Sequence, residues 1–143
     1  MTPVSQLLAE KGSDIYSLKP SDPVIDGIRL MAEKSVGALL VMEGEQLLGI
    51  LSERDYARKV ILLGRSSKDI PVSAIMTPTP LVTVKPSNNV RECMRLMHSR
   101  RIRHLPVVEG DNVMGVLSIG DIVRAIIQEQ DAEIQQLTQY IAG

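Results

Sequence analysis

The second half of this chain repeats its first half at a nearly constant offset, so that Lys19 recurs as Lys85. The matching blocks, each given as first and second copy, are Pro3–Ser5 with Pro71–Ser73, Lys19–Ser21 with Lys85–Ser87, Arg29–Met31 with Arg95–Met97, and Gly49–Asp55 with Gly115–Asp121. Two copies are too few for a solenoid, which needs three or more stacked repeats. The repetition therefore predicts a pair of like domains, with function inside each unit or in the groove between them.

Each repeat carries the pattern of strand–helix–strand–strand–helix. The predicted strands are Ile15–Leu18, Ala38–Met42 and Leu47–Leu51 in the first repeat, and Leu81–Val84, Leu105–Val108 and Val113–Leu117 in the second. The last two strands of each repeat are joined by a polar turn containing Gly, which predicts a hairpin. Polar residues in Pro20–Pro23 and Pro86–Asn89 predict capped helix starts. Apolar stripes predict the second helices, through Tyr56, Val60 and Ile61 in the first repeat and Ile122, Val123, Ile126 and Ile127 in the second.

We therefore expect an α/β (α+β) fold of tandem units packed with pseudo-twofold symmetry. The predicted boundaries are 1–63 for the first repeat with an N-terminal lead-in helix, 64–68 for a linker, 69–127 for the second repeat and 128–143 for a C-terminal helix. This last helix is predicted over Asp131–Ile141, where Ile134, Leu137 and Ile141 lie in register. Units packed face to face would leave two symmetric clefts, and clefts between domains are preferred ligand sites.

Composition excludes several classes of function. A formal net charge of −1 argues against a general nucleic-acid binder, and the absence of Trp and Phe argues against base-stacking platforms. No apolar run approaches the length of a membrane span, and no signal-peptide pattern is present, so a cytoplasmic location is expected. The single cysteine, Cys93, rules out an intramolecular disulfide and is predicted to pack in the core.

The heptads Gly49–Asp55 and Gly115–Asp121 are predicted to end a strand and open a helix. A helix N-terminus offers unpaired N–H groups and the positive end of the helix dipole, which suits a phosphate. The Ser hydroxyl could donate to that phosphate, and the Asp carboxylate could accept from ribose hydroxyls. The alternative is a capping box, in which Ser and Asp satisfy the helix's own donors. Recurrence of the heptad at equivalent places favours the ligand role.

The heptad, preceded by an apolar-Pro-Val strand such as Leu105–Val107, resembles the CBS domain, and Pro3 to about Ile127 resembles a stand-alone CBS pair, or Bateman module. The resemblance implies a regulatory module that binds adenosine nucleotides such as AMP, ATP or NAD(H) in clefts between the repeats. It implies that Asp55 and Asp121 hold ribose, with Ser52 and Ser118 near ribose or phosphate.

The resemblance also implies a nucleotide role for residues that begin the second strand of each repeat. In the second repeat, Arg103 and His104 would meet phosphate, followed by Leu105 and Pro106; Arg reads phosphate bidentately. The equivalent stretch of the first repeat lacks these basic groups and consists of Val36, Gly37 and Ala38. There, Arg54 of the heptad, with Arg58 and Lys59 after it, would have to meet any phosphate. Thr77 and Thr83 occupy positions similar to those that line adenine and phosphate in this family, although a residue such as Thr83 is more often a plain strand residue.

The expected function is therefore a ligand sensor that passes energy or redox state to an unidentified partner protein. The alternative is a protein-interaction or redox-regulator scaffold in which nucleotide is structural. No nucleophile–base pair, paired carboxylates or metal cluster emerges from the sequence, so neither an enzyme nor a metal protein is expected, and neither nucleic acid nor membrane is an expected partner.

Two further expectations concern assembly and ligand choice. A homodimer is predicted through the helical faces of Val24, Ile28, Met31, Met94 and Met97, with contacts added by Ile134 and Leu137. The clefts are predicted to be inequivalent. AMP should prefer the cleft served by Arg103 and His104, whereas the roomier one beside Gly37 and Ala38 should accept NAD(H).

Overall fold

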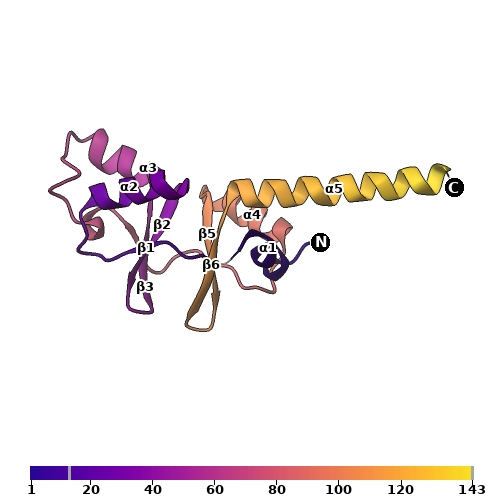
Figure 1. Cartoon of the computed structure of the whole chain (residues 1–143), viewed down its shortest axis with the longest axis horizontal. Helices are drawn as coiled ribbons and strands as arrows, with labels where there is room; N and C mark the ends of the chain where they lie inside the picture. The colour runs from indigo at the N-terminus through magenta and orange to yellow at the C-terminus, as the bar shows by residue number, and fades with distance from the viewer. Residues whose placement is uncertain (13, 143) are drawn as a thin grey trace. The chain divides into compact units, whose positions relative to one another are not determined.

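The computed structural model describes residues 1–12 and 14–142, which belong to two compact units (Figure 1). The first-repeat unit comprises Ile15–Val82 with Asp111–Val113, and the second-repeat unit comprises Met1–Asp14, Thr83–Gly110 and Met114–Gly143. The helix–strand–strand–helix core of each predicted repeat thus lies mainly in one unit. Each unit is described separately below.

The first-repeat unit is built on a four-stranded sheet with the order β1-β2-β3-β4. Its elements are β1 (Ser17–Leu18), α2 (Val24–Lys34), β2 (Ala38–Glu43), β3 (Gln46–Ser52), α3 (Glu53–Tyr56), the π-helical turn η1 (Ala57–Ile61), the 3-10 turn η2 (Val72–Ala74) and β4 (Thr77–Pro78). The hairpin of β2 and β3 confirms the prediction, and β1 pairs in parallel with β2. Helix α2 packs closely on the sheet, since a Cβ atom added at Gly27 would lie 2.7 Å from Leu51 Cδ2.

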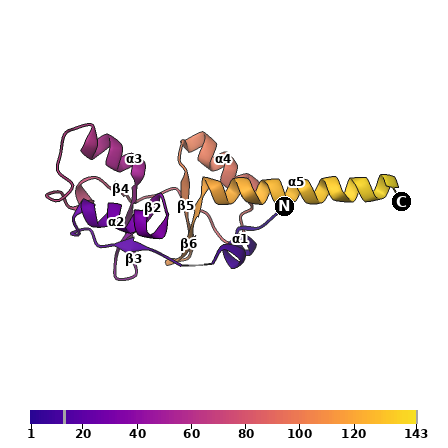
Figure 2. The ribbon, with the colours of Figure 1, turned by 45° about the horizontal axis from the view of Figure 1, so that its top comes forward.

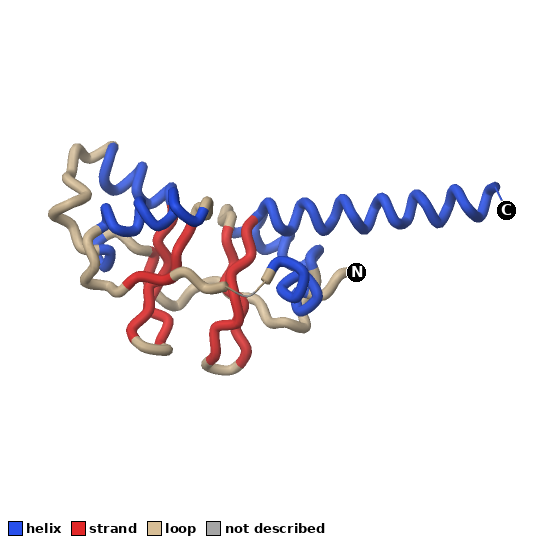
Figure 3. Tube along the Cα trace, viewed as in Figure 1, coloured by secondary structure: helices blue, strands red, loops and turns tan. Residues whose placement is uncertain are grey.

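The second-repeat unit contains α1 (Val4–Lys11), α4 (Val90–Arg100), β5 (His104–Glu109), most of β6 (Asn112–Ser118) and α5 (Ile119–Ala142). Strands β5 and β6 form the predicted hairpin (Figure 3). The predicted strand Leu81–Val84 is wrong, because only Val84 forms a bridge, parallel to Val107. The strand that forms earlier in the chain is β4, which pairs with β3 through Thr77 and Ile50.

The segments that begin at Pro3 and at Pro71 are the lead-ins of the first and second repeats. Each lead-in packs against the other repeat, not against the repeat that follows it in sequence. In the second-repeat unit, Val4 N donates to Asn88 O at 2.7 Å and Val90 N donates to Thr2 O at 3.0 Å. The same pair of bonds recurs in the first-repeat unit, where Val72 N donates to Asp22 O at 2.8 Å and Val24 N donates to Ile70 O at 2.9 Å. Val4 and Val72 are both fully buried. Each compact unit therefore contains the lead-in of the other repeat, and the units differ from the boundaries predicted along the sequence. The reason is that Val4 and Val72 are buried against the helix start of the other repeat.

The two first helices begin differently. Asn89 caps α4 as predicted, its side chain accepting from Glu92 N at 3.0 Å. The side-chain cap predicted for α2 is wrong, since Pro23 stands at the cap position and Asp22 Oδ2 accepts instead from Lys19 N at 2.9 Å. The first N–H groups of α2 are met by backbone carbonyls of the exchanged segment, so that no side-chain cap is needed there.

One prediction about the last helix is also wrong. A separate helix over Asp131–Ile141 does not exist, because α5 continues unbroken from Ile119 to Ala142. Neither Gly nor Pro occurs after Gly120 in this helix, so nothing in its sequence stops it. The apolar stripe that predicted the start of this helix is buried only in part, since Ile122 is buried whereas Val123 and Ile127 are exposed.

Three residues predicted to line a dimer face belong to the interior of their own units. Val24, Met31 and Met97 are each at most 4% exposed. Ile28 and Met94 are half-buried. A dimer contact through the three buried side chains is therefore excluded, and Ile28, Met94, Ile134 and Leu137 are the remaining candidates from that prediction.

Candidate functional site

The second heptad forms the predicted passage from strand to helix. Strand β6 ends at Ser118 and α5 begins at Ile119. Ser118 N donates to Asp121 Oδ2 at 2.8 Å, and Asp121 N donates back to Ser118 Oγ at 3.2 Å. This reciprocal pair is a capping box, which satisfies donors that the first turn of a helix otherwise leaves open. The capping interpretation therefore holds in this structure.

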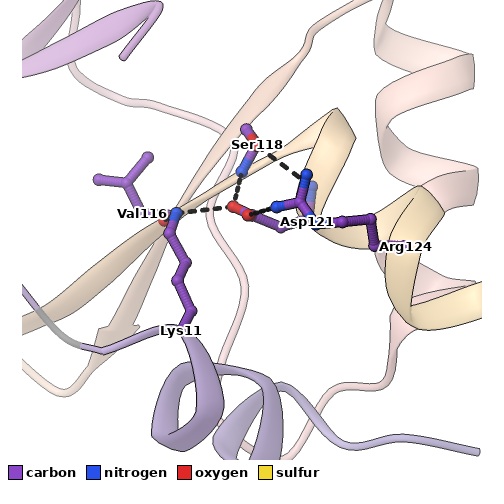
Figure 4. A network of polar contacts seen from close by, with 5 residues as sticks. All are labelled: Lys11, Val116, Ser118, Asp121 and Arg124. Atoms are coloured by element: carbon purple, nitrogen blue, oxygen red, sulfur yellow. Dashed lines mark hydrogen bonds and ion pairs between the residues drawn. The ribbon is translucent and has the colours of Figure 1, made fainter. Parts of the chain in front are cut away.

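Two cations close on the same carboxylate (Figure 4). Lys11 Nζ lies 2.6 Å from Asp121 Oδ2 and also donates to Val116 O at 2.7 Å. The Arg124 guanidinium lies 2.6 Å from Asp121 Oδ1. Asp121 is only 5% exposed, whereas the side chains of Lys11 and Arg124 are 39% and 69% exposed. The site is thus a buried carboxylate covered by two cations that reach it from solvent.

Electrostatics keep Asp121 ionised. Burial acts to raise its pKa, because desolvation penalises the charged form. The hydrogen bond and charge of Lys11, together with the bonds from Ser118, outweigh this effect and hold the pKa of Asp121 below its ordinary value. The side chain is therefore an acceptor near neutral pH, ready to receive hydroxyl donors.

The first heptad repeats the capping box with different outer partners. Ser52 N and Ser52 Oγ donate to Asp55 Oδ2 at 3.1 and 3.0 Å, and Asp55 N donates to Ser52 Oγ at 3.1 Å. Lys59 Nζ lies 3.2 Å from Asp55 Oδ1, and Thr77 Oγ1 donates to that oxygen at 3.5 Å. Asp55 is buried like its counterpart, but its ion pair with Lys59 is longer than the pairs of Asp121, and Lys59 comes from the same helical segment.

The lead-ins also explain why both heptads begin with glycine. A Cβ atom at Gly49 would lie 2.6 Å from Thr77 O and 2.8 Å from Met76 Sδ. At Gly115 it would lie 2.9 Å from Leu8 Cδ2. Leu8 follows Val4 at the same spacing as Met76 follows Val72. Equivalent lead-in residues therefore cover the two glycines, and each lead-in brings a polar group, Lys11 or Thr77, to the nearby Asp.

Residues at the start of the second strand lie beside the heptad in both units. Glu53 N donates to Gly37 O at 3.0 Å, and Ile119 N donates to Arg103 O at 2.8 Å. Ala38 pairs with Ser52 across β2 and β3, and Val36 is half-buried just before it. Arg103 is exposed, His104 half-buried and Leu105 fully buried. The backbone of this stretch thus adjoins each helix start, while the Leu105 side chain is directed to the core.

The other candidates are placed less uniformly. Thr77 contacts Asp55 as described, and Arg54 is half-buried in α3. Thr83 is exposed next to the bridging Val84. Pro106 is buried, and its carbonyl accepts from Val84 N at 3.0 Å. The structure therefore brings Thr77 to the first heptad, whereas Thr83 and Pro106 lie with the bridge that joins Val84 to β5.

The sequence analysis missed Lys11 and Arg124. Arg124 could have been found, since it follows Asp121 by three residues and therefore lies on the same helical face. Lys11 carries no such signal, because its contact with Asp121 spans 110 positions of sequence. Its place depends on the exchange of lead-ins.

No group of three or more His, Cys, Asp or Glu residues that could hold a metal ion occurs among residues 1–12 and 14–142. In the same part of the chain, no helix is long and apolar enough to cross a membrane. An open groove of about 640 Å³ runs between α4 and α5, and its lining includes Arg91, Arg95 and Glu129 but no heptad residue. It is not part of the heptad sites.

Known proteins resemble this chain in sequence and in fold. The family model of the CBS domain matches residues 5–61 and 72–128. The mitochondrial CBS domain-containing protein CBSX3 of Arabidopsis thaliana is 43% identical over 99% of this chain and 73% of its own length. A solved putative signal-transduction protein with CBS domains from Burkholderia ambifaria is 48% identical, with a TM-score of 0.85 over 90% of this chain and 96% of that one.

A third relative is solved with a ligand. The CBS domain protein PAE2072 from Pyrobaculum aerophilum, complexed with AMP, is 26% identical, with a TM-score of 0.76 over 91% of this chain and 98% of that one. The same family is indicated by the two matched segments, by the repeated heptads and by the mixed α/β units. The chain therefore belongs to the CBS-domain family, as a protein with two CBS domains in tandem.

Proposed function

We propose that this protein is a sensor of adenosine nucleotides, in which Asp55 and Asp121 hold ribose hydroxyls. The observation that carries the proposal is the recurrence of a buried Asp beside a helix start, with cations that approach from solvent. The AMP complex of the Pyrobaculum aerophilum relative supports an adenosine nucleotide as the ligand class. A regulatory rather than catalytic role is in keeping with this family membership.

Binding at the second heptad would exchange partners on Asp121. Ribose hydroxyls donate to the carboxylate, and Lys11 and Arg124, which now hold it at 2.6 Å each, become available to the phosphate. Both cations are flexible and partly exposed, so they can move without disturbing the core. Arg124 offers a bidentate fork and Lys11 a point charge, which suits a compact phosphate group.

The proposed signal leaves the site through α1. Lys11 is the last residue of α1, and its side chain links this helix to β6 and to the start of α5. A ligand that releases Lys11 changes the free energy that holds α1 on the second-repeat unit. A ligand can shift a conformational equilibrium only by its different affinity for the two states. The partner protein would then recognise the state of α1.

The finer ligand preferences remain predictions. The second heptad, served by Lys11, Arg124 and the nearby Arg103, has the charge for AMP or ATP. NAD(H) is proposed for the first heptad, where Gly37 and Ala38 replace the basic pair and Lys59 and Arg54 supply the cations. A cytoplasmic location is likewise a proposal, and the CBSX3 relative is a mitochondrial protein.

Calorimetry with AMP, ATP and NADH tests the proposal. Asp55→Asn and Asp121→Asn keep the size and one acceptor oxygen but remove the charge. Each is expected to weaken binding at its own heptad by about 10- to 100-fold, the equivalent of about 1.5–3 kcal/mol for a hydrogen bond to a charged group. Asp111→Asn, at an exposed turn, is the matched control. Unchanged affinity in both heptad variants would remove these carboxylates from the site.

Hydrogen exchange separates the sensor from a scaffold with structural nucleotide. The sensor predicts that AMP lowers the protection of α1 amides from Ser5 to Lys11, because Lys11 is released, whereas a structural ligand would raise protection throughout the second-repeat unit, α1 included. Protection of α1 that rises with that of the rest of the unit would favour the scaffold.

A further inference from the structure

Side chains of α5 attach α1 to the second-repeat unit at both of its ends. At the C-terminal end of α1, Lys11 binds Asp121 in the first turn of α5. At the other end, the backbone N–H of Thr2, just before the helix, donates to Glu129 Oε1. Figure 2 shows the start of the chain beside α5. Two carboxylates of α5, eight positions apart, therefore bind the two ends of one lead-in.

Glu129 is shielded from water and contacts two elements at once. Its side chain is 14% exposed, and its second oxygen, Oε2, lies 3.6 Å from Arg91 Nε of α4. Burial acts to raise the pKa of Glu129, but the hydrogen bonds from Thr2, followed by nearby positive charges that include Arg91, hold the pKa below its ordinary value. Val90 N donates to Thr2 O at 3.0 Å, so both backbone groups of Thr2 are bonded. Glu129 therefore anchors the start of the lead-in between α4 and α5.

Helix α1 is too short to be stable without these contacts. It has eight residues, whereas isolated helices shorter than about 12–15 residues are marginal in water. Val4, Leu7 and Leu8 are its buried residues, and the others are exposed. The helix therefore forms and docks as one unit, and a contact at either end stabilises the same docked state.

The contacts at the two ends are therefore coupled. Because Thr2 and Lys11 belong to one docked segment, a contact that holds Thr2 also makes Lys11 harder to remove from Asp121. In the proposed function, Lys11 leaves Asp121 when ribose hydroxyls take its place, so the Glu129 contact opposes nucleotide binding. Coupling between two sites is reciprocal, so bound nucleotide must weaken the contact of Glu129 with Thr2 by the same factor.

We propose that Glu129 regulates nucleotide binding at the second heptad, as an anchor that keeps α1 docked and Lys11 on Asp121. The proposal rests on the proposed function and adds to it a positioning residue that lies about two turns of α5 away from Asp121. It also indicates where the signal arrives. Met1, Arg91 and Glu129 line the groove between α4 and α5, so release of the lead-in changes the wall of that groove.

The first-repeat unit differs at the positions that match this anchor. In the alignment of the two repeats, Leu63 takes the place of Glu129, and Ile70 takes the place of Thr2. Leu63 is an apolar side chain that is 64% exposed. The ion pair of Asp55 is made by Lys59, which comes from the same helical segment rather than from a lead-in. We therefore expect regulation by an anchor to be confined to the second heptad.

Calorimetry with AMP tests the regulation. Glu129→Ala removes the anchor and suits a helix, because Ala has the highest helix propensity. It is expected to raise AMP affinity at the second heptad, the affinity that Asp121→Asn weakens, by about 5-fold, which is the low end of the usual coupling between sites. Glu129→Gln keeps an acceptor for Thr2 N and should give a smaller rise. Glu133→Ala, at an exposed position of the same helix, is the matched control and should leave the affinity unchanged. A purely structural Glu129 would not oppose binding, so unchanged or weaker binding in Glu129→Ala would overturn the proposal.

Hydrogen exchange without nucleotide tests the coupling of the two ends separately from nucleotide binding. In Glu129→Ala, the amides of residues 8–11, at the far end of α1 from Thr2, are expected to lose protection relative to Glu133→Ala. A loss confined to the residues beside Thr2 would show that the two ends act independently, and the proposal would fall. If wild type binds no AMP while the far end of α1 responds to Glu129→Ala, the proposed function is refuted and the coupling across α1 is confirmed.

Discussion

Removing the Lys11 ammonium should loosen the attachment of α1 to the second-repeat unit. Lys11→Met keeps most of the aliphatic length and deletes the contacts at 2.6 Å to Asp121 Oδ2 and 2.7 Å to Val116 O. Hydrogen bonds to charged groups contribute about 1.5–3 kcal/mol each where they are shielded from water. Lys11 is 39% exposed, so water and salt screen much of this interaction, and Arg124 remains paired with Asp121. We expect a loss of about 1–2 kcal/mol in the free energy of unfolding.

Urea denaturation at neutral pH measures this loss, and a double-mutant cycle assigns it. Asp121→Asn should cost less in the Lys11→Met background than in wild type, because the ion pair has already gone. The exposed Lys68→Met serves as a control for removing a positive charge and is expected to stay within about 0.5 kcal/mol of wild type. Lys59→Met should have a smaller effect than Lys11→Met, since its pair with Asp55 is 3.2 Å long and its side chain is 43% exposed.

Two results would refute this reasoning. One is a Lys11→Met variant no less stable than Lys68→Met. The other is strict additivity of Lys11→Met and Asp121→Asn, which would mean that the two side chains do not stabilise the fold through each other.

Three further predictions concern the heptads and the buried thiol. Gly49→Ala should lower the free energy of unfolding by about 1–3 kcal/mol, and by more than Gly115→Ala does. The reason is that the methyl group at position 49 would meet the backbone at Thr77 O, whereas the methyl group at position 115 would meet the flexible end of the Leu8 side chain. Equal melting temperatures of the two variants would contradict this. Because the pKa of Asp121 is lowered in the folded state, its contribution to stability is present above the ordinary pKa of a carboxyl group and is lost as pH falls through the folded pKa. In urea titrations, wild type should therefore lose more stability than Asp121→Asn between pH ~5 and ~2. Equal losses in the two proteins would count against the pairing of Asp121 with its cations. Burial, followed by the charge of Glu92, raises the pKa of Cys93 to about 11, so a thiol reagent at pH 8 should react only after denaturant is added, and fast reaction of the native protein would contradict the buried position.

Local patterns in the sequence determined much of the fold. The repeated blocks predicted two similar units, and the family comparison confirms two CBS domains. Both hairpins follow from short apolar runs around Gly44 and Gly110, which have positive φ angles of 60° and 62°. The heptads open helices where predicted, because Ser and Asp three residues apart form a capping box from local residues alone. These features need no information from distant parts of the chain.

The tertiary structure decided which partners the local elements receive. Nothing near Lys11 in sequence shows that it meets Asp121, and nothing near Val4 shows that the lead-in packs beside Asn88. The wrong predictions have the same cause, because the sequence does not show which distant residues a local element contacts. Periodicity identifies an apolar stripe but not what covers it, so Val24 and Met31 were predicted on a dimer face and are buried within their own unit. The free energy of burial depends on the whole set of contacts, and repeats of similar sequence can exchange segments at little cost in local structure. The sequence alone therefore determined the elements and the heptads, and only the tertiary structure decided which lead-in closes each site.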